Sequence, residues 1–192
     1  MSIEYYNQNA KTFYDGTLAV DMSSLYSHFE PFLCEGGLIL DAGCGSGRDS
    51  LYFQQRGFQV VAMDASSELV QMATQLTGLP VEICRFDEFH HGEAFDGIWA
   101  CASLLHVPMA ELAPVVHHLA NLLKSGGLFY CSFKYGEGES VRDGRTFTNL
   151  DEKGLARLIQ DLPLEMRELW QTEDLRPGRG QECWLNAILV KQ

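Results

Sequence analysis

The sequence predicts an α/β fold in which a mostly parallel β-sheet is covered by helices on both faces. Short apolar runs alternate with stretches of helical character between residues 38 and 160. The runs are nearly continuous in apolar residues, which is typical of strands buried on both faces. The last two runs follow each other without an intervening helix, so we expect a hairpin that leaves the final strand antiparallel.

The first half of the chain holds three expected strands and two helices. Gly57 suits the C-cap of the first helix, because a residue without a Cβ adopts the left-handed conformation freely. Ser66 or Ser67 can cap the second helix, which Gly78 and Pro80 should end. The expected elements are strand 38–40, helix 48–55, strand 58–63, helix 67–76 and strand 81–84.

The second half supplies four more strands, which gives a sheet of seven. The Gly126-Gly127 pair should separate a long helix from the fifth strand. A glycine-rich loop then precedes one more helix and the closing hairpin. The expected elements are strand 95–100, helix 109–123, strand 128–133, loop 136–144, helix 151–160, and strands 164–171 and 183–190.

Composition narrows the classes of function. The 192 residues suit one domain over 1–192, and the net charge of −12 comes with no Lys/Arg-rich run. Nucleic acids and anionic membrane surfaces are therefore unexpected partners. The six cysteines are scattered without a C-x-x-C pair, so we expect neither disulfides nor a metal site. With no signal-like N-terminus and no long apolar run, the sequence favours a cytoplasmic protein.

The turn after the first expected strand carries the strongest motif. It reads Asp41-Ala42-Gly43-Cys44-Gly45-Ser46-Gly47-Arg48. A dinucleotide fingerprint would need glycine at position 48, and a phosphate-binding loop would need Gly-Lys-Ser/Thr. Asp64 ends the second strand, where a carboxylate can accept hydrogen bonds from both hydroxyls of a ribose. Asp87 follows the third strand and is placed to accept a hydrogen bond from an exocyclic amine.

Residues 40–47 resemble motif I of the class I S-adenosylmethionine (SAM) dependent methyltransferases. Asp64, Asp87 and residues 95–100 fall where that family has its ribose, adenine and fourth-strand motifs, and residues 122–127 resemble its turn into strand five. Residues 47–52 further resemble the small-molecule branch typified by tellurite-resistance methyltransferases. The resemblance implies a Rossmann-like, seven-stranded sheet over 36–192 that binds SAM and releases S-adenosylhomocysteine.

The resemblance also implies roles for individual residues. The loop of Gly43, Cys44 and Gly45 would approach the methionine and ribose portions of the cofactor, and Asp41 would support that loop and the amino group. The remaining implied contacts are Asp64 to the ribose, Ala65 and Glu88 beside the adenine, Asp87 to the adenine amine, and the carbonyl of Ala100 or Cys101 to the methionine ammonium.

Residues for the methyl acceptor are less clearly marked. His106 lies just past the fourth strand and is the candidate catalytic base, although it could instead cap a helix or order the loop. Residues 1–35 form an expected helical lid segment, from which Tyr5 and Tyr14 could reach the sulfonium. The alternative is that aromatic residues such as Tyr6 and Phe13 simply pack a helix onto the sheet.

Two loops beyond the strand ends carry basic residues. Lys134, Arg145, Arg176 and Arg179 should converge on one rim, because both loops open at the same edge of the sheet. Such a rim could bind an anionic methyl acceptor, since arginine recognises carboxylate and phosphate in a bidentate way. The same residues could instead form surface ion pairs with neighbouring acids.

The sequence thus predicts an enzyme that methylates a small molecule, because little beyond the core remains to dock a macromolecule. The main alternative is a regulatory module that binds SAM or S-adenosylhomocysteine without catalysis. A nucleotide-linked oxidoreductase is a second alternative, which Arg48 in place of a third glycine disfavours.

Overall fold

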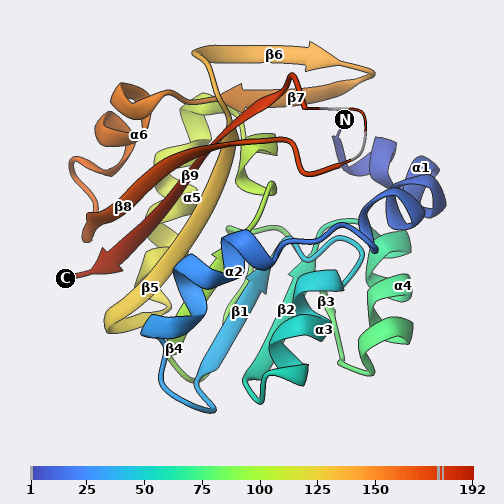
Figure 1. Ribbon diagram of the computed structural model, residues 1–192, viewed down its shortest axis with the longest axis horizontal. Helices are drawn as coiled ribbons and strands as arrows, with labels where there is room; N and C mark the ends of the chain where they lie inside the picture. The colour runs from blue at the N-terminus through green and yellow to red at the C-terminus, as the bar shows by residue number, and fades with distance from the viewer. Residues whose placement is uncertain (1, 177, 179) are drawn as a thin grey trace.

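A seven-stranded sheet forms the centre of the computed structural model, which describes residues 2–176, 178 and 180–192 (Figure 1). The strand order is β3-β2-β1-β4-β5-β9-β8. The strands are β1 (Leu38–Ala42), β2 (Gln59–Asp64), β3 (Glu82–Ile83), β4 (Phe95–Ala100), β5 (Leu123–Lys134), β8 (Leu164–Glu173) and β9 (Cys183–Lys191). Only β9 runs antiparallel to its neighbours, β5 and β8, so the predicted Rossmann-like sheet and its antiparallel last strand are confirmed.

Helices cover both faces of this sheet, as predicted. The helices are α1 (Ser2–Thr17), α2 (Ser23–Phe29), α3 (Arg48–Gln55), α4 (Ser67–Thr77), α5 (Met109–Asn121) and α6 (Glu152–Ile159). Alternate residues of β1 point to opposite faces. Leu40 belongs to the core formed with α5 and α6, whereas Ile39 belongs to the core formed with α2 and α3.

Helix α4 begins and ends at the cap residues that the sequence predicted. The Ser66 hydroxyl accepts a hydrogen bond from the Leu69 amide at 3.3 Å. Gly78 adopts a left-handed conformation with a φ of 73°, and its amide donates to the Thr74 carbonyl. These local contacts fix where α4 begins and ends.

The glycine-rich loop expected over 136–144 is instead part of a hairpin, with β6 (Gly138–Arg142) pairing antiparallel with β7 (Arg145–Asn149). Asp143 and Gly144 form its turn with φ values of 50° and 75°. Two successive positive φ values suit the primed turn of a two-residue hairpin, for which Asp-Gly is a favoured sequence. The prediction of a loop was wrong because it gave more weight to the high glycine content than to the Asp143-Gly144 turn signal.

Strand β5 begins five residues earlier than expected and runs through the glycine pair. Leu123 pairs with Phe95 before the register shifts, so the strand contains an irregularity rather than a preceding turn. A Cβ at Gly127 would lie 2.8 Å from the Lys124 carbonyl oxygen. The glycine pair therefore accommodates a bulge within the strand.

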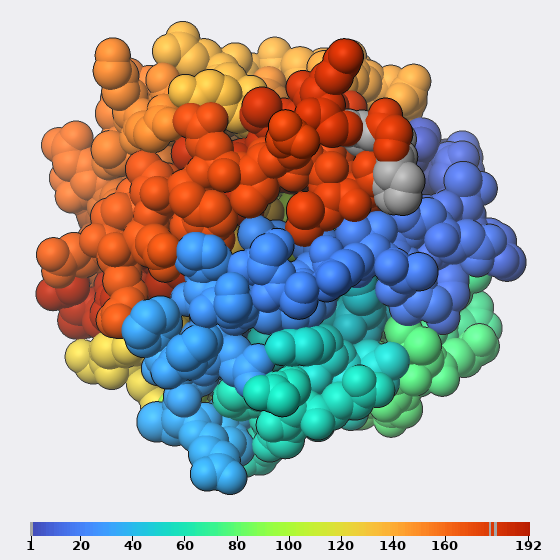
Figure 2. Space-filling model, viewed as in Figure 1, coloured from blue at the N-terminus to red at the C-terminus, as the bar shows by residue number. Residues whose placement is uncertain are grey.

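The carboxyl ends of the parallel strands face α1 and the β6–β7 hairpin (Figure 1). Helix α1 packs against α4 and β7. Figure 2 shows the N-terminal segment, in blue, meeting the C-terminal segments, in orange to red, across one face of the molecule. Within the described part of the chain, no helix combines the length and the apolar character that crossing a membrane requires.

Candidate functional site

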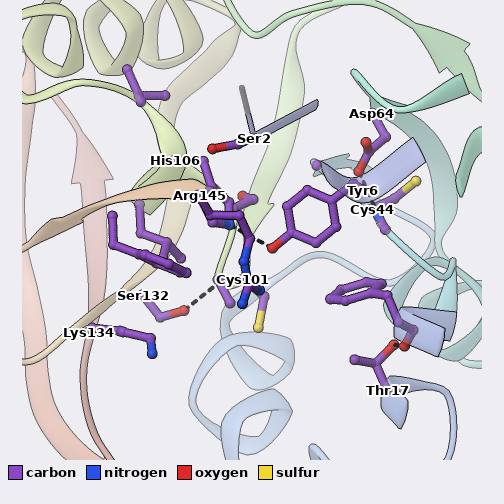
Figure 3. Close-up of a pocket in the computed structure, with 18 of the residues that line it drawn as sticks. Ser2, Tyr6, Thr17, Cys44, Asp64, Cys101, His106, Ser132, Lys134 and Arg145 are labelled. Atoms are coloured by element: carbon purple, nitrogen blue, oxygen red, sulfur yellow. Dashed lines mark hydrogen bonds between the residues drawn. The ribbon is translucent and has the colours of Figure 1, made fainter. Parts of the chain in front are cut away.

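A cavity of about 730 Å³ lies at the carboxyl ends of the strands, between the sheet, α1 and the β6–β7 hairpin (Figure 3). Its wall brings together residues that are far apart in the sequence. The sequence-predicted residues in the wall are Gly43, Cys44, Gly45, Asp64, Ala65, Asp87, Cys101, His106, Lys134, Arg145 and Arg176. Arg179 lies outside the described residues.

The glycine loop after β1 forms one side of this cavity. The amides of Gly43 and Cys44 both donate to the Met63 carbonyl, at 2.9 and 3.0 Å, which ties the loop to the end of β2. Gly43 has a φ of 79°, and a Cβ there would lie 2.5 Å from the Cβ of Ser103. Glycine is required at this position for both its conformation and its packing.

Asp64 joins the two loops that follow β1 and β2. Its carboxylate accepts hydrogen bonds from the Gly45 amide at 2.9 Å and from the Ser66 amide at 2.8 Å. Burial raises the pKa of the Asp64 carboxyl, while these amides act in the opposite direction. The carboxylate is thus fixed in the cavity wall, next to the glycine loop (Figure 3).

Three other residues that the family resemblance assigns to cofactor binding do not belong to the described wall of the cavity. Asp41 is buried behind the loop, where it accepts a hydrogen bond from Ser50 Oγ at 2.5 Å. Burial and the neighbouring Asp49 raise the pKa of Asp41. Ala100 is fully buried in β4 and Glu88 is exposed, and neither contributes to the described wall. Of these three, Asp41 is placed to support the loop.

Asp87 lines the cavity but also forms an ion pair at its edge. The Arg85 Nε donates to the Asp87 carboxylate at 3.1 Å, and both side chains are about half exposed. The Arg85 guanidinium lowers the pKa of Asp87. The carboxylate is therefore charged and accessible to a ligand donor.

Asp49, which the sequence reasoning missed, organises the floor of the site. Its carboxylate accepts hydrogen bonds from Tyr26 Oη at 2.6 Å, Trp99 Nε1 at 2.9 Å and Arg48 Nε at 2.6 Å. Burial alone would raise the pKa of Asp49, but Arg48 and the other donors hold it below its ordinary value. The network connects α2, α3 and β4 beneath the cavity. The sequence feature that could have identified Asp49 is its position directly after the glycine motif.

His106 lies in the opposite part of the cavity, in the short helix η2 (Leu104–His106). Its Nδ1 lies 2.9 Å from the Thr146 carbonyl oxygen, which can only accept, so Nδ1 carries the proton. Its Nε2 is then unprotonated and accepts a hydrogen bond from Tyr6 Oη at 2.8 Å. Burial lowers the pKa of His106 to about 4, and the neighbouring Arg145 and Lys134 act in the same direction. The ring is neutral near pH 7.

Helix α1 presents a different pair of aromatic residues from the one suggested by the sequence. Tyr6 and Phe13 line the cavity, whereas its described wall includes neither Tyr5 nor Tyr14. Tyr6 and Phe13 lie on either side of a kink at Asn9, and their rings meet edge-on with centroids 5.1 Å apart. Tyr5 instead stacks on the Arg145 guanidinium, 4.2 Å from its ring centroid. The sequence reasoning had assigned Tyr6 and Phe13 to simple packing.

Three cations of the predicted basic rim line the cavity, and each has an acidic partner, as the ion-pair alternative expected. Lys134 Nζ lies 2.5 Å from Glu182, and Arg176 pairs with Asp174. Arg145 has a weaker partner, since Asp143 lies 3.3 Å away and its side chain is 74% exposed. Its Nε is buried without a hydrogen-bond partner among the described residues. The guanidinium also hydrogen-bonds the Tyr6 hydroxyl and lines the cavity, where its remaining N–H groups can reach a ligand.

The family model and the relatives that this chain resembles are all described as methyltransferases. Residues 39–127 match a family model described as a methyltransferase domain. A ubiquinone biosynthesis O-methyltransferase from Paramagnetospirillum magneticum is 32% identical over 108 residues, which cover 54% of this chain and 42% of that protein. The malonyl-[acyl-carrier protein] O-methyltransferase of Salmonella typhimurium is 28% identical over 140 residues, which cover 72% of this chain and 45% of that protein. The matched stretches thus span less than half of either relative.

A solved structure resembles the fold along the whole chain. The 1,6-didemethyltoxoflavin-N1-methyltransferase of Burkholderia thailandensis, with bound 1,6-didemethyltoxoflavin and S-adenosylhomocysteine, superposes with a TM-score of 0.77 at 22% identity. The match covers 100% of this chain and 86% of that one. At this level of identity the likeness establishes the fold.

Proposed function

We propose that this chain, which has the fold of the class I SAM-dependent methyltransferases and a methyltransferase domain over residues 39–127, transfers a methyl group from SAM to a small-molecule acceptor. The observation that carries the proposal is the pairing of the glycine loop with Asp64 on the wall of the cavity. Both relatives described above are named as O-methyltransferases, which supports the reaction type.

The residues present fit the cofactor. A Cβ at Gly43 or Gly45 would meet Ser103 at 2.5 Å or Phe13 at 3.0 Å, so the loop can take this position in the cavity wall only with glycine at both sites. Asp64 supplies a fixed carboxylate for the ribose hydroxyls, and Asp87 supplies an accessible one for the adenine amine. Bound there, SAM supplies a methyl group on a positively charged sulfur. Ala65 and Cys101 complete this part of the wall.

Binding of S-adenosylhomocysteine tests this proposal directly. Calorimetric titration should give one site per chain, and Asp64→Ala should raise the Kd about 10- to 100-fold because hydrogen bonds to a charged group are lost. The exposed Asp161→Ala is the matched control and should bind like the natural protein. Absence of binding by the folded natural protein, or equal binding of NAD, would contradict the proposal.

The rest of the cavity favours an enzyme over a regulatory module. Beyond the glycine loop, the wall continues through Tyr6, His106, Lys134 and Arg145, which offers room and polar groups for a second ligand. A module that only senses SAM has no need of this part. Turnover with a panel of small acceptors separates the two functions, because a regulatory module would bind cofactor and methylate nothing in the panel.

The proposed methyl acceptor is small and anionic, with Arg145 as its main cationic contact and Lys134 and Arg176 beside it. The likeness of residues 47–52 to the tellurite-resistance type supports the small-molecule branch. In this proposal the chain works as one domain in the cytoplasm, with residues 1–35 as the lid.

Arg145→Ala should raise the KM for an anionic acceptor about 10- to 100-fold while the Kd for S-adenosylhomocysteine stays unchanged, since a charge-assisted hydrogen bond is lost outside the cofactor part of the site. Initial-rate kinetics and calorimetry measure the two quantities. Arg167→Ala is the matched control, because Arg167 stacks on Phe32 away from the cavity. An unchanged KM in Arg145→Ala would rule out its role as the anion contact.

A further inference from the structure

Two consecutive hydrogen bonds link the Thr146 carbonyl, His106 and Tyr6, and in each of them the donor and the acceptor are fixed. The Thr146 carbonyl can only accept, so it holds the proton of His106 on Nδ1. The lone pair on Nε2 must then accept the hydroxyl proton of Tyr6. The Thr146 carbonyl in β7 therefore determines that the Tyr6 hydroxyl on α1 is a hydrogen-bond donor to His106.

This direction decides what Tyr6 offers to a ligand. Its single hydroxyl proton is donated to His106, so its oxygen has only lone pairs left, of which one accepts from Arg145 and one remains for the cavity. Figure 3 shows the Tyr6 hydroxyl directed toward His106 and Arg145 in the interior of the site. A ligand group that complements this oxygen must donate a hydrogen bond.

The charges around Tyr6 limit which donor fits. Arg145 from β7 lies 6.0 Å from the Tyr6 ring centroid, and Lys134 from β5 contributes a second positive charge near His106. Tyr5 from α1 stacks on the Arg145 guanidinium, and Asp64 from β2 is held by two backbone amides. Glu182 offsets the charge of Lys134, so the Arg145 guanidinium is the cation that disfavours an ammonium donor and stabilises an oxyanion here. An acidic hydroxyl satisfies both requirements.

We propose that the methyl acceptor is a phenol or an enol, methylated on oxygen, and that Tyr6 and His106 remove its proton. This inference rests on the proposed function and adds the acceptor atom to it. The acceptor oxygen bonds to the methyl carbon as the carbon–sulfur bond breaks and its electron pair goes to sulfur. The hydroxyl proton passes to Tyr6 Oη while the proton of Tyr6 moves to His106 Nε2, from which it reaches solvent after product leaves. Because the pKa of His106 is lowered to about 4, this transfer accompanies formation of the oxygen–carbon bond and does not precede it.

Tyr6 is the new catalytic residue in this scheme, and His106 acts through it. The Tyr6 ring packs edge-on against His106 and Phe13, with centroids 5.3 and 5.1 Å apart, so phenylalanine at position 6 can keep the packing and lose only the hydroxyl. Tyr135→Phe is the matched control, because its hydroxyl bonds Glu152 outside the described wall of the cavity.

The first test is a binding measurement that needs no turnover. In the presence of S-adenosylhomocysteine, 2-naphthol should bind about tenfold tighter than its methyl ether, 2-methoxynaphthalene, because only the naphthol can donate to Tyr6. Ligand fluorescence reports both titrations. Tyr6→Phe should reduce the preference to less than about twofold, and Tyr135→Phe should retain it. Equal binding of the two compounds to the natural protein would overturn the inference.

The second test separates proton removal from a structural role of Tyr6. Tyr6→Phe should lower kcat about 100-fold with 2-naphthol, but by less than about threefold with the more acidic 4-nitrophenol at a pH where that phenol is already ionised. A uniform loss for both acceptors would show a structural role and overturn the inference. Faster methylation of 2-naphthylamine than of 2-naphthol would do the same.

Failure of this inference is distinguishable from failure of the proposed function. If S-adenosylhomocysteine binds and phenols show no preference, only the assignment of the acceptor atom is overturned. If S-adenosylhomocysteine does not bind to the folded protein, the proposed function is wrong, and the inference is overturned with it.

Discussion

Asp49→Ala should lower the free energy of unfolding by about 3–5 kcal/mol, because it leaves the buried Arg48 guanidinium without its counterion. The substitution also removes the partner of two other buried donors, Tyr26 Oη and Trp99 Nε1. A carboxylate that is 6% exposed and accepts hydrogen bonds from three side chains cannot be replaced by water without opening the floor of the site. We therefore expect Asp49→Ala to be among the most damaging single changes in the chain.

Urea unfolding followed by circular dichroism measures this loss as a lower midpoint with an unchanged slope. Asp15→Ala is the matched control, because Asp15 pairs with Lys11 on an exposed helix surface and its side chain is 56% exposed. The control should change stability by less than about 0.5 kcal/mol. A loss below about 1 kcal/mol in Asp49→Ala would mean that the buried network does not hold the floor together.

Gly43→Ala should weaken the binding of S-adenosylhomocysteine by about 100-fold or more. An alanine there must adopt a φ of 79°, which is strained, and its Cβ would overlap that of Ser103 at 2.5 Å. The loop must move to relieve this overlap, and small displacements of a binding loop have large effects. Because the Gly43 and Cys44 amides are tied to β2, the displacement would also disturb Asp64.

Calorimetry on Gly43→Ala is paired with Gly78→Ala, which separates the steric effect from backbone strain. Gly78 has a similar φ of 73°, but no heavy atom lies within 4 Å of its ideal Cβ position. Gly78→Ala should lower stability by about 1–2 kcal/mol and leave the Kd unchanged. Natural affinity in a folded Gly43→Ala protein would show that this loop does not hold the cofactor.

The sequence predicted the parts of the site that depend on short stretches of chain. The glycine loop, the strands before it and Asp64 lie in contiguous segments whose glycine spacing and apolar runs have few structural solutions. The ends of α4 were also predictable, because Ser66 and Gly78 act on neighbouring backbone groups. In these segments the residues that carry the signal are also the residues that make the contacts.

The errors arose where two signals competed locally. Residues 136–144 are rich in glycine, yet Asp143-Gly144 makes a hairpin turn that places Arg145 and Thr146 on β7. The Gly126-Gly127 pair indicated a turn, yet pairing with β4 keeps these residues inside β5. Composition did not decide either case, because strand pairing supplies the hydrogen bonds that a loop would lack.

By itself, the sequence determined the α/β fold, the order along the chain of the strands in the seven-stranded sheet and, for one half of the cavity wall, the glycine loop and Asp64. Only the tertiary structure decided the other half, because its key contact joins Tyr6 to His106 across 100 positions of the chain. The choice of Tyr6 over Tyr5 depends on which face of α1 packs inward, and the proton positions depend on a carbonyl in β7. Such long-range hydrogen bonds leave no periodic pattern in the sequence, since their partners come from segments that lie far apart in the chain.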